Sequence, residues 1–164
     1  MKKGFTIIEV LIYIAIATML LFSLSSFIIS VIDLRERAKV VGEIEQQGAR
    51  IMDTITYSLR KADLINSPTP GNFSDNLSLI MTDPTKNPTV FNLSGQTLQI
   101  TQGFTSPENL NNDSILVENL RFNNLSYPDT PGVVQIQFTL KYNYLNSRSV
   151  IDYQKTFQSS ASLR

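Results

Sequence analysis

The chain has 164 residues, 14 of them basic and 14 acidic, so its formal net charge is zero. This balance removes any global electrostatic argument for nucleic-acid binding. The sequence contains no cysteine and no histidine, which excludes disulfides, thiolate metal sites, Ser-His triads and histidine-liganded zinc. We therefore expect no catalytic residues, no cofactor and no metal. The length predicts a single extramembrane domain plus a tail.

The N-terminal sequence reads MKKGFTIIE, in which Lys2, Lys3 and Gly4 precede an apolar segment that holds one acid, Glu9. No charged residue interrupts the segment from Val10 to Ile32. A run of roughly 23 residues without charge is long enough to span a bilayer with some tilt. The sequence therefore predicts a transmembrane helix over residues 5–32.

A cleavable secretory signal is the alternative, because residues 15–17 form an A-x-A pattern. Apolar sequence continues for about 15 residues past it, whereas the apolar part of a signal peptide ends within about 7–15 residues, so an anchor is favoured. Lysines precede the run, and Arg35, Arg37 and Lys39 follow it. The positive-inside rule thus leaves the orientation of the helix open.

This N-terminal arrangement resembles the leader and N-terminus of type IV prepilins and of the pseudopilins of type II secretion systems. The resemblance implies that a prepilin peptidase cleaves between Gly4 and Phe5 and methylates the new amino terminus of Phe5. Residues 1–4 would then be a cytoplasmic leader, and the C-terminal domain would lie outside the inner (cytoplasmic) membrane after a single pass. The implied partners are other pilin or pseudopilin subunits, membrane lipid and, indirectly, an assembly platform with its ATPase.

Cleavage would create a positive amine at Phe5, four residues and about 6 Å along a helix from Glu9. An unpaired carboxylate in lipid is a net penalty. Pairing it with the Phe5 amine of a neighbouring subunit would relieve the penalty and fix the stagger between subunits. We assign Phe5, Thr6 and Glu9 to assembly, and Lys2 and Lys3 to attraction of the leader to the anionic membrane surface. The alternative is a chance acid in an ordinary signal anchor.

Residues 33–65 are predicted to continue the helix, now with apolar residues on one face only. No proline occurs between Phe5 and Asn66, so one helix of about 60 residues is sterically possible. We expect the apolar stripe to pack on a sheet, with a homomeric coiled coil as the alternative. The stripe consists of Leu34, Ala38, Val41, Ile44, Gly48, Ile51, Ile55, Leu59 and Ala62, widened by Met52.

Residues 66–164 are predicted to form a β-rich extracytoplasmic domain. A turn-rich segment, Ser67–Asn72, should follow the helix. In Val134–Tyr142 the even-numbered residues are apolar and the odd-numbered ones polar, which indicates a half-buried strand, with Ile151, Tyr153 and Phe157 in its hairpin partner. The other predicted strands are Leu77–Met81, Val90–Leu93, Leu98–Thr101 and Ile115–Val117, the last continuing through Leu120 and Phe122. The fold class is α+β: a long N-terminal helix packed on an antiparallel sheet, as in pilins.

Two other readings of the outer domain are weaker. Asp75, Asp83 and Asp113 offer the oxygen ligands that calcium prefers, but without a regular loop spacing they are better explained as turn residues. The only candidate DNA-binding patch gathers cations and tyrosines near the last hairpin. It comprises Lys141, Tyr142, Tyr144, Arg148, Tyr153 and Lys155. Tyrosines at such positions more often belong to a sheet core, and nucleic acid is not an expected partner.

The sequence thus predicts a structural protein, a minor subunit of a type IV pilus-like or type II secretion filament. The late hairpin, which follows Val117–Phe122, resembles that of large minor pilins and J-type minor pseudopilins. An intact Glu9 does not suit the tip pseudopilin type, which characteristically lacks the acid. The alternative function is that of a single-pass, membrane-anchored binding protein or adhesin that never polymerises.

Overall fold

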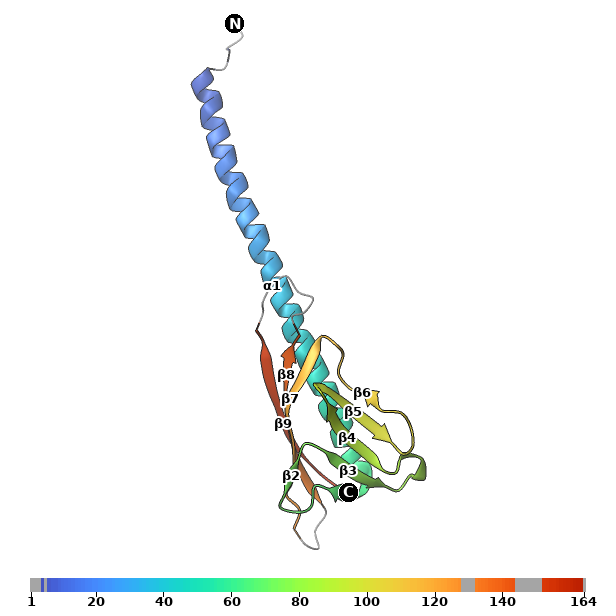
Figure 1. The fold of residues 1–164 in the computed structure, drawn as a ribbon. Helices are drawn as coiled ribbons and strands as arrows, with labels where there is room; N and C mark the ends of the chain where they lie inside the picture. Colours follow the sequence, from blue (N-terminus) through green and yellow to red (C-terminus); the bar gives the residue numbers. More distant parts are fainter. Residues whose placement is uncertain (1–3, 5, 128–131, 144–151, 164) are drawn as a thin grey trace. The chain divides into compact units, whose positions relative to one another are not determined.

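The structure is a computed structural model that describes Gly4 and residues 6–127, 132–143 and 152–163. It divides into two compact units, Met1–Lys39 and Val40–Arg164. A single helix, α1 (Ile7–Lys61), begins in the first unit and ends in the second, and all the described strands follow it in sequence (Figure 1). The predicted long N-terminal helix is confirmed.

The helix ends at Lys61, four residues before the predicted boundary at 65. The next residues form β1 (Ala62–Ser67), which pairs antiparallel with β3 (Leu77–Met81) and aligns Ala62 with Met81. Nothing in the local sequence forbids another helical turn here. Pairing with a distant strand therefore overrides the helical pattern, and the Pro- and Gly-containing loop at residues 68–72 follows a strand rather than a helix.

The first sheet has five strands in the order β1-β3-β4-β5-β6, all antiparallel. Its remaining strands are β4 (Thr89–Ser94), β5 (Thr97–Gln102) and β6 (Glu108–Asn109), and a short 3-10 helix, η1 (Pro84–Lys86), lies between β3 and β4. Gly95, with a φ of 64°, makes the tight turn between β4 and β5. Each of the three strands predicted in this region is present, with boundaries one residue longer or unchanged.

The second sheet has four antiparallel strands in the order β2-β7-β8-β9. They are β2 (Phe73–Ser74), β7 (Ile115–Asn124), β8 (Val133–Tyr142) and β9 (Gln154–Ser162). The predicted hairpin of the last two strands is confirmed, and Val134, Ile136, Phe138 and Leu140 of β8 are fully buried, as the alternation indicated. Residues 144–151, which include the predicted turn, lie outside the described residues.

The predicted α+β fold, a long helix packed on antiparallel strands, is confirmed, but the strands form two sheets rather than one. A buried asparagine lies where the two sheets meet. The Asn111 side chain accepts a hydrogen bond from the backbone N–H of Leu98 (2.7 Å) and donates one to the carbonyl of Ile115 (2.6 Å). The backbone N–H of Val117 also donates to the carbonyl of Gln96 (2.9 Å). These contacts replace a regular ladder between β5 and β7, so polar backbone groups are satisfied where the chain passes from one sheet to the other.

The core of the second unit lies between the helix after Val40 and the two sheets, which flank these turns (Figure 1). Ile44, Ile51, Ile55 and Leu59 have no exposed surface. The predicted stripe is correct over this part. It was wrong at its start, because Leu34 is 66% exposed and Val40 is buried in place of Val41.

Strand β9 contacts the helix at Gly48 and Glu45. The ring of Phe157 lies against Gly48, where a Cβ atom would overlap it, and stacks on Phe138 at a centroid distance of 5.4 Å. The ammonium group of Lys155 forms an ion pair with the Glu45 carboxylate. Gly48, weak as a helix former, is therefore explained by the aromatic ring that it admits.

Candidate processing and assembly site

The predicted processing point lies just before α1. Gly4 is exposed, and a Cβ atom there would meet no other atom within 4 Å. Thr6 is also exposed, and the helix begins at the next residue. Lys2, Lys3 and Phe5, to which the sequence assigns the leader charge and the new amino terminus, lie outside the described residues. The described part of this segment presents no side chain that would shield the Gly4 backbone from a protease.

Thr6 occupies the N-cap position of the helix. Its hydroxyl oxygen accepts a hydrogen bond from the Glu9 N–H at 3.4 Å, and its carbonyl accepts from the N–H groups of Glu9 (3.1 Å) and Val10 (3.3 Å). Threonine followed three residues later by glutamate is the capping-box pattern. This capping box can be read directly from the sequence T-I-I-E, but it was not among the predicted features.

Glu9, the predicted assembly residue, is half-buried in the first turn of α1. Its carboxylate accepts a hydrogen bond from the Tyr13 hydroxyl, with 3.2 Å between the oxygen atoms. A negative charge in the first helical turn also interacts favourably with the helix dipole. The Glu9 carboxylate therefore has a hydrogen-bond donor within its own helix. This contact from Tyr13 was not among the predictions from the sequence.

The helix that follows Glu9 exposes apolar side chains on every side. Met19 is 78% exposed and Phe22 is 80% exposed. Polar side chains in this segment bond to the backbone of the same helix: the hydroxyl of Thr18 donates to the Ala15 carbonyl, and that of Ser25 to the Leu21 carbonyl, each at 2.9 Å. Among the described residues, α1 is the one helix long and apolar enough to cross a membrane, a test that a signal sequence also passes.

The second unit has a cleft of about 690 Å³ on the four-stranded sheet. The Arg121 guanidinium lies over the Phe73 ring, 4.0 Å from its centroid. Asp75 is the one carboxylate in the lining, so a pair for acid-base work is lacking there. The lining residues are Phe73, Ser74, Asp75, Asn119, Leu120, Arg121 and Gln137.

A second cleft, about 450 Å³, lies where α1 ends, between the helix and the C-terminal end of β9. Tyr57, Arg60 and Lys61 come from the helix, and Ser162 and Leu163 from the strand side. The Lys61 ammonium lies 4.5 Å from the centroid of the Tyr57 ring. Its hydrogen bond and charge lower the pKa of the Tyr57 phenol.

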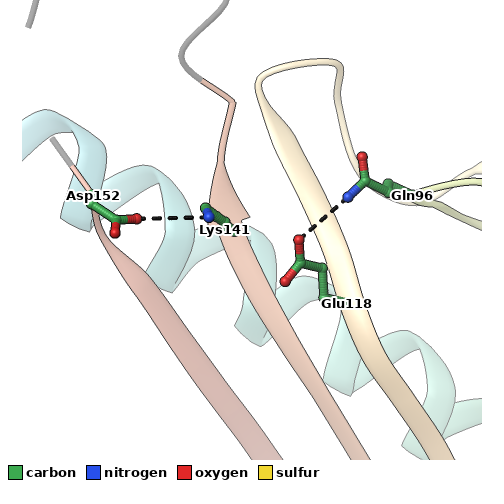
Figure 2. Close-up of polar contacts among 4 residues, drawn as sticks. All are labelled: Gln96, Glu118, Lys141 and Asp152. Carbon is green, nitrogen blue, oxygen red and sulfur yellow. Dashed lines mark hydrogen bonds and ion pairs between the residues drawn. The ribbon is translucent and has the colours of Figure 1, made fainter. Parts of the chain in front are cut away.

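The two described lysines of the candidate DNA-binding patch have acidic partners. Figure 2 shows the Lys141 ammonium 3.9 Å from the Asp152 carboxylate, and Lys155 is paired with Glu45. Tyr142 and Tyr153 are partly buried against the core. Tyr144 and Arg148 lie outside the described residues. In the described part of this patch both lysines are paired with acids and both tyrosines are partly buried, so the patch gives little support to DNA binding.

The candidate calcium ligands are turn residues in the described structure. Asp83 caps the 3-10 helix η1 by accepting from the Thr85 N–H (3.0 Å) and hydroxyl (2.7 Å), and these bonds lower the pKa of its carboxyl. The Asp113 carbonyl accepts from the Asn143 side chain at 3.1 Å. Within the described ranges, no group of three or more acidic side chains is placed to hold a metal ion.

Comparison with known families supports the reading of the N-terminus. The family model for the prokaryotic N-terminal methylation motif matches residues 1–25, which include Gly4, Thr6, Glu9 and Tyr13. The match supports a type IV pilin-like N-terminus. The motif supports a pilin or pseudopilin that a prepilin peptidase processes, and the α+β architecture agrees with it. No curated protein and no solved structure matches the chain.

The family match covers the N-terminal segment and leaves the rest of the chain unmatched. Residues 1–25 cover the processing point, the cap and the lone acid. The two clefts and both sheets lie beyond the match. The motif therefore supports processing by a peptidase and assembly with other pilin subunits. It carries no information on which molecules the outer domain contacts.

Proposed function

We propose that this chain is a structural subunit, a minor pilin or pseudopilin, that enters a filament through its N-terminal helix. A prepilin peptidase would cleave after Gly4 and methylate Phe5, and Lys2 and Lys3 would hold the leader at the anionic surface. Residues 5–32 would cross the inner membrane once, residues 33–65 would connect to the outer domain, and residues 66–164 would supply most of its extracytoplasmic surface.

The observation that carries this proposal is Glu9, the one acid between Ile7 and Ile32 of α1, a segment whose apolar side chains are exposed on all sides. A helix that is apolar all round needs lipid or other helices around it. In a filament, neighbouring helices would cover these side chains, and the amine of Phe5 from the next subunit would pair with Glu9. An incorrect stagger would leave both charges unpaired in an apolar surrounding, so the same pair would select the register.

The proposed role is structural rather than enzymatic. The outer domain would adapt the filament surface or tip to its partners, and the assembly platform and its ATPase would supply the work. The minor role rests on the late hairpin of β8 and β9, which resembles that of large minor pilins and J-type pseudopilins. Quantitative mass spectrometry of isolated filaments tests it: a minor subunit would be present at a small fraction of the main subunit, and comparable amounts would contradict the proposal.

Mass spectrometry of the protein from its native host tests the processing step. We expect a mature chain that begins with methylated Phe5. Retention of residues 1–4 in a cell that processes other prepilins would contradict the filament role and favour a permanently anchored binding protein or adhesin.

Substitution of the acid tests the assembly step. Glu9→Ala should leave cleavage after Gly4 intact and lower the ratio of subunit in sheared filaments to subunit in the membrane. Asp33→Ala is the matched control, because Asp33 is an exposed acid on the same helix that lies just beyond the uncharged run. Assembly of the Glu9 variant at the wild-type level would show that the pairing argument is wrong.

A further inference from the structure

The carboxylate of Glu9 has a partner within its own helix, one turn further along. The Tyr13 hydroxyl donates to Glu9 Oε1, with 3.2 Å between the two oxygens. We propose that Tyr13 is a positioning residue for assembly: its hydroxyl holds the Glu9 carboxylate in place and satisfies part of it before a neighbouring subunit arrives. This inference rests on the proposed function, because it concerns the same contact.

Helix geometry makes this contact specific to residue 13. Side chains at positions i and i+4 lie on the same face, and long side chains in a helix point back towards its N-terminus. Tyr13 therefore reaches towards Glu9. The flanking Ile12 and Ile14 are apolar and more than half exposed, so neither residue next to Tyr13 could replace its hydroxyl as a donor.

The Tyr13 hydroxyl reduces the free-energy cost of placing the Glu9 carboxylate in an apolar environment. An isolated carboxylate in an apolar environment loses its hydration, and a hydrogen bond to a charged group recovers part of that loss. A carboxylate has about four acceptor sites, so one bond from a phenol leaves room for an ammonium group. Tyr13 can thus support Glu9 in the membrane without competing with the amine that pairs with it later.

The competing explanation is that Tyr13 is an interfacial anchor. Tyrosine is enriched at membrane interfaces, where its ring is apolar and its hydroxyl is wet. An anchor would act on the position of the helix in the membrane, independently of Glu9. A positioning residue would act only while Glu9 is present. The two roles are therefore separated by combining substitutions at both positions.

The experiment compares full-length variants in the native host, with the ratio of subunit in sheared filaments to subunit in the membrane as the measurement. Tyr13→Phe keeps the ring and removes the donor, and we expect the ratio to fall on the order of tenfold, as for loss of a hydrogen bond to a charged group. Tyr13→Gln, which restores a donor at the same spacing, should recover much of the loss. Thr18→Val is the matched control, because it removes a hydroxyl that bonds only to the Ala15 carbonyl.

The combined variants decide the interpretation. In the Glu9→Ala background, Tyr13→Phe should have no further effect, and cleavage of every variant should stay at the wild-type level. If Tyr13→Phe assembles normally while Glu9→Ala does not, the positioning role is wrong and the proposed function stands. An equal loss from Tyr13→Phe with and without Glu9 would identify an interfacial anchor and also overturn the inference. Normal assembly of Glu9→Ala itself would show that the pairing argument is wrong and would overturn this inference with it, whereas failure of the filament role would appear as retention of residues 1–4.

Discussion

The two parts of α1, residues 7–39 and residues 40–61, belong to one helix but depend on different partners. In the first part apolar side chains are exposed on all sides, as for Ile16 (53%) and Leu21 (63%). In the second part a single face is buried against strands of the same chain, and Ile51 and Ile55 have no exposed surface. A helical segment that is apolar on all sides needs packing partners outside the chain, whereas a segment that is apolar on one side packs against strands of the same chain.

This difference also separates two kinds of stabilisation. The described contacts of the first part are local, such as the Thr6 cap and the hydrogen bond from Tyr13 to Glu9. Those of the second part join residues far apart in sequence, such as Gly48 with Phe157. Substitutions in the second part should therefore change the unfolding of the monomer, whereas substitutions in the first should change insertion or assembly.

Truncation of a buried isoleucine should have the largest effect on unfolding. Ile55→Ala should lower the free energy of unfolding by about 2–5 kcal/mol, because it leaves a cavity between the helix and the sheets. Ile14→Ala, at a position that is 55% exposed, should leave monomer unfolding nearly unchanged. Urea titration of the full chain in detergent micelles, followed by tyrosine fluorescence, provides the measurement, since the chain has six tyrosines and no tryptophan. Equal effects at both positions would remove the distinction between the two parts.

The two glycines of the second part provide a matched test at smaller scale. Gly48→Ala places a methyl group where the Phe157 ring lies and should destabilise the unit by about 1–3 kcal/mol. Gly42→Ala meets open space and should stabilise the helix by about 1 kcal/mol, as alanine is the better helix former. Effects of opposite sign in the same titration are the expected result. Stabilisation by both substitutions would show that the ring moves aside without penalty.

Sequence periodicity predicted the second part of the helix well where the buried face is continuous. Positions 44, 48, 51, 55 and 59 are buried as expected. The predicted stripe was wrong at Leu34. Periodicity shows that apolar residues share one face of the helix, but it does not show where the strands that cover this face end. The helix end at Lys61 was also missed, since the pairing of β1 with β3 joins residues from 11 (Ser67 and Ser78) to 19 (Ala62 and Met81) positions apart.

The strands were predicted from local alternation, but their division into two sheets was not. Alternation identifies a buried face and says nothing about which strand lies beside which. The division depends on Asn111, whose side chain bonds to Leu98 and Ile115. In the sequence, Asn111 is one asparagine in a loop rich in them. Around the site, Gly4 and Glu9 could be identified from the motif, whereas the contact from Tyr13 required the helix geometry.

The Thr6 cap tests whether the start of the first part depends on local contacts. Thr6→Val removes the hydroxyl oxygen, which shares the Glu9 N–H with the Thr6 carbonyl, and should destabilise the first helical turn by about 1 kcal/mol. Amide hydrogen exchange in micelles should accelerate at Glu9 and Val10 and stay unchanged in the second unit. Thr18→Val, which removes only a bond to the preceding turn, is the control. Faster exchange across the whole chain would contradict a local role for the cap.

The smallest expected effect concerns the ion pair between Lys155 of β9 and Glu45 of the second part. Glu45 raises the pKa of Lys155 above its ordinary value of 10.5. A raised folded-state pKa gives stability that is fully present below the unfolded value and is lost as pH rises through the folded value. Lys155→Met should therefore lower stability slightly and equally from pH 7 to about pH 9, and the difference from wild type should shrink above about pH 10.5.

A control for that ion pair lies on the same sheet. Lys141 pairs with Asp152 at 3.9 Å, at a position where Asp152 is 73% exposed and neither residue belongs to the helix (Figure 2). Lys141→Met should change stability less than Lys155→Met, because an exposed pair within one sheet contributes little. Glu45→Gln should reproduce the pH dependence of Lys155→Met, since either change removes the same pair. If the Lys155 and Glu45 variants differ in that pH dependence, a group other than this ion pair responds to pH.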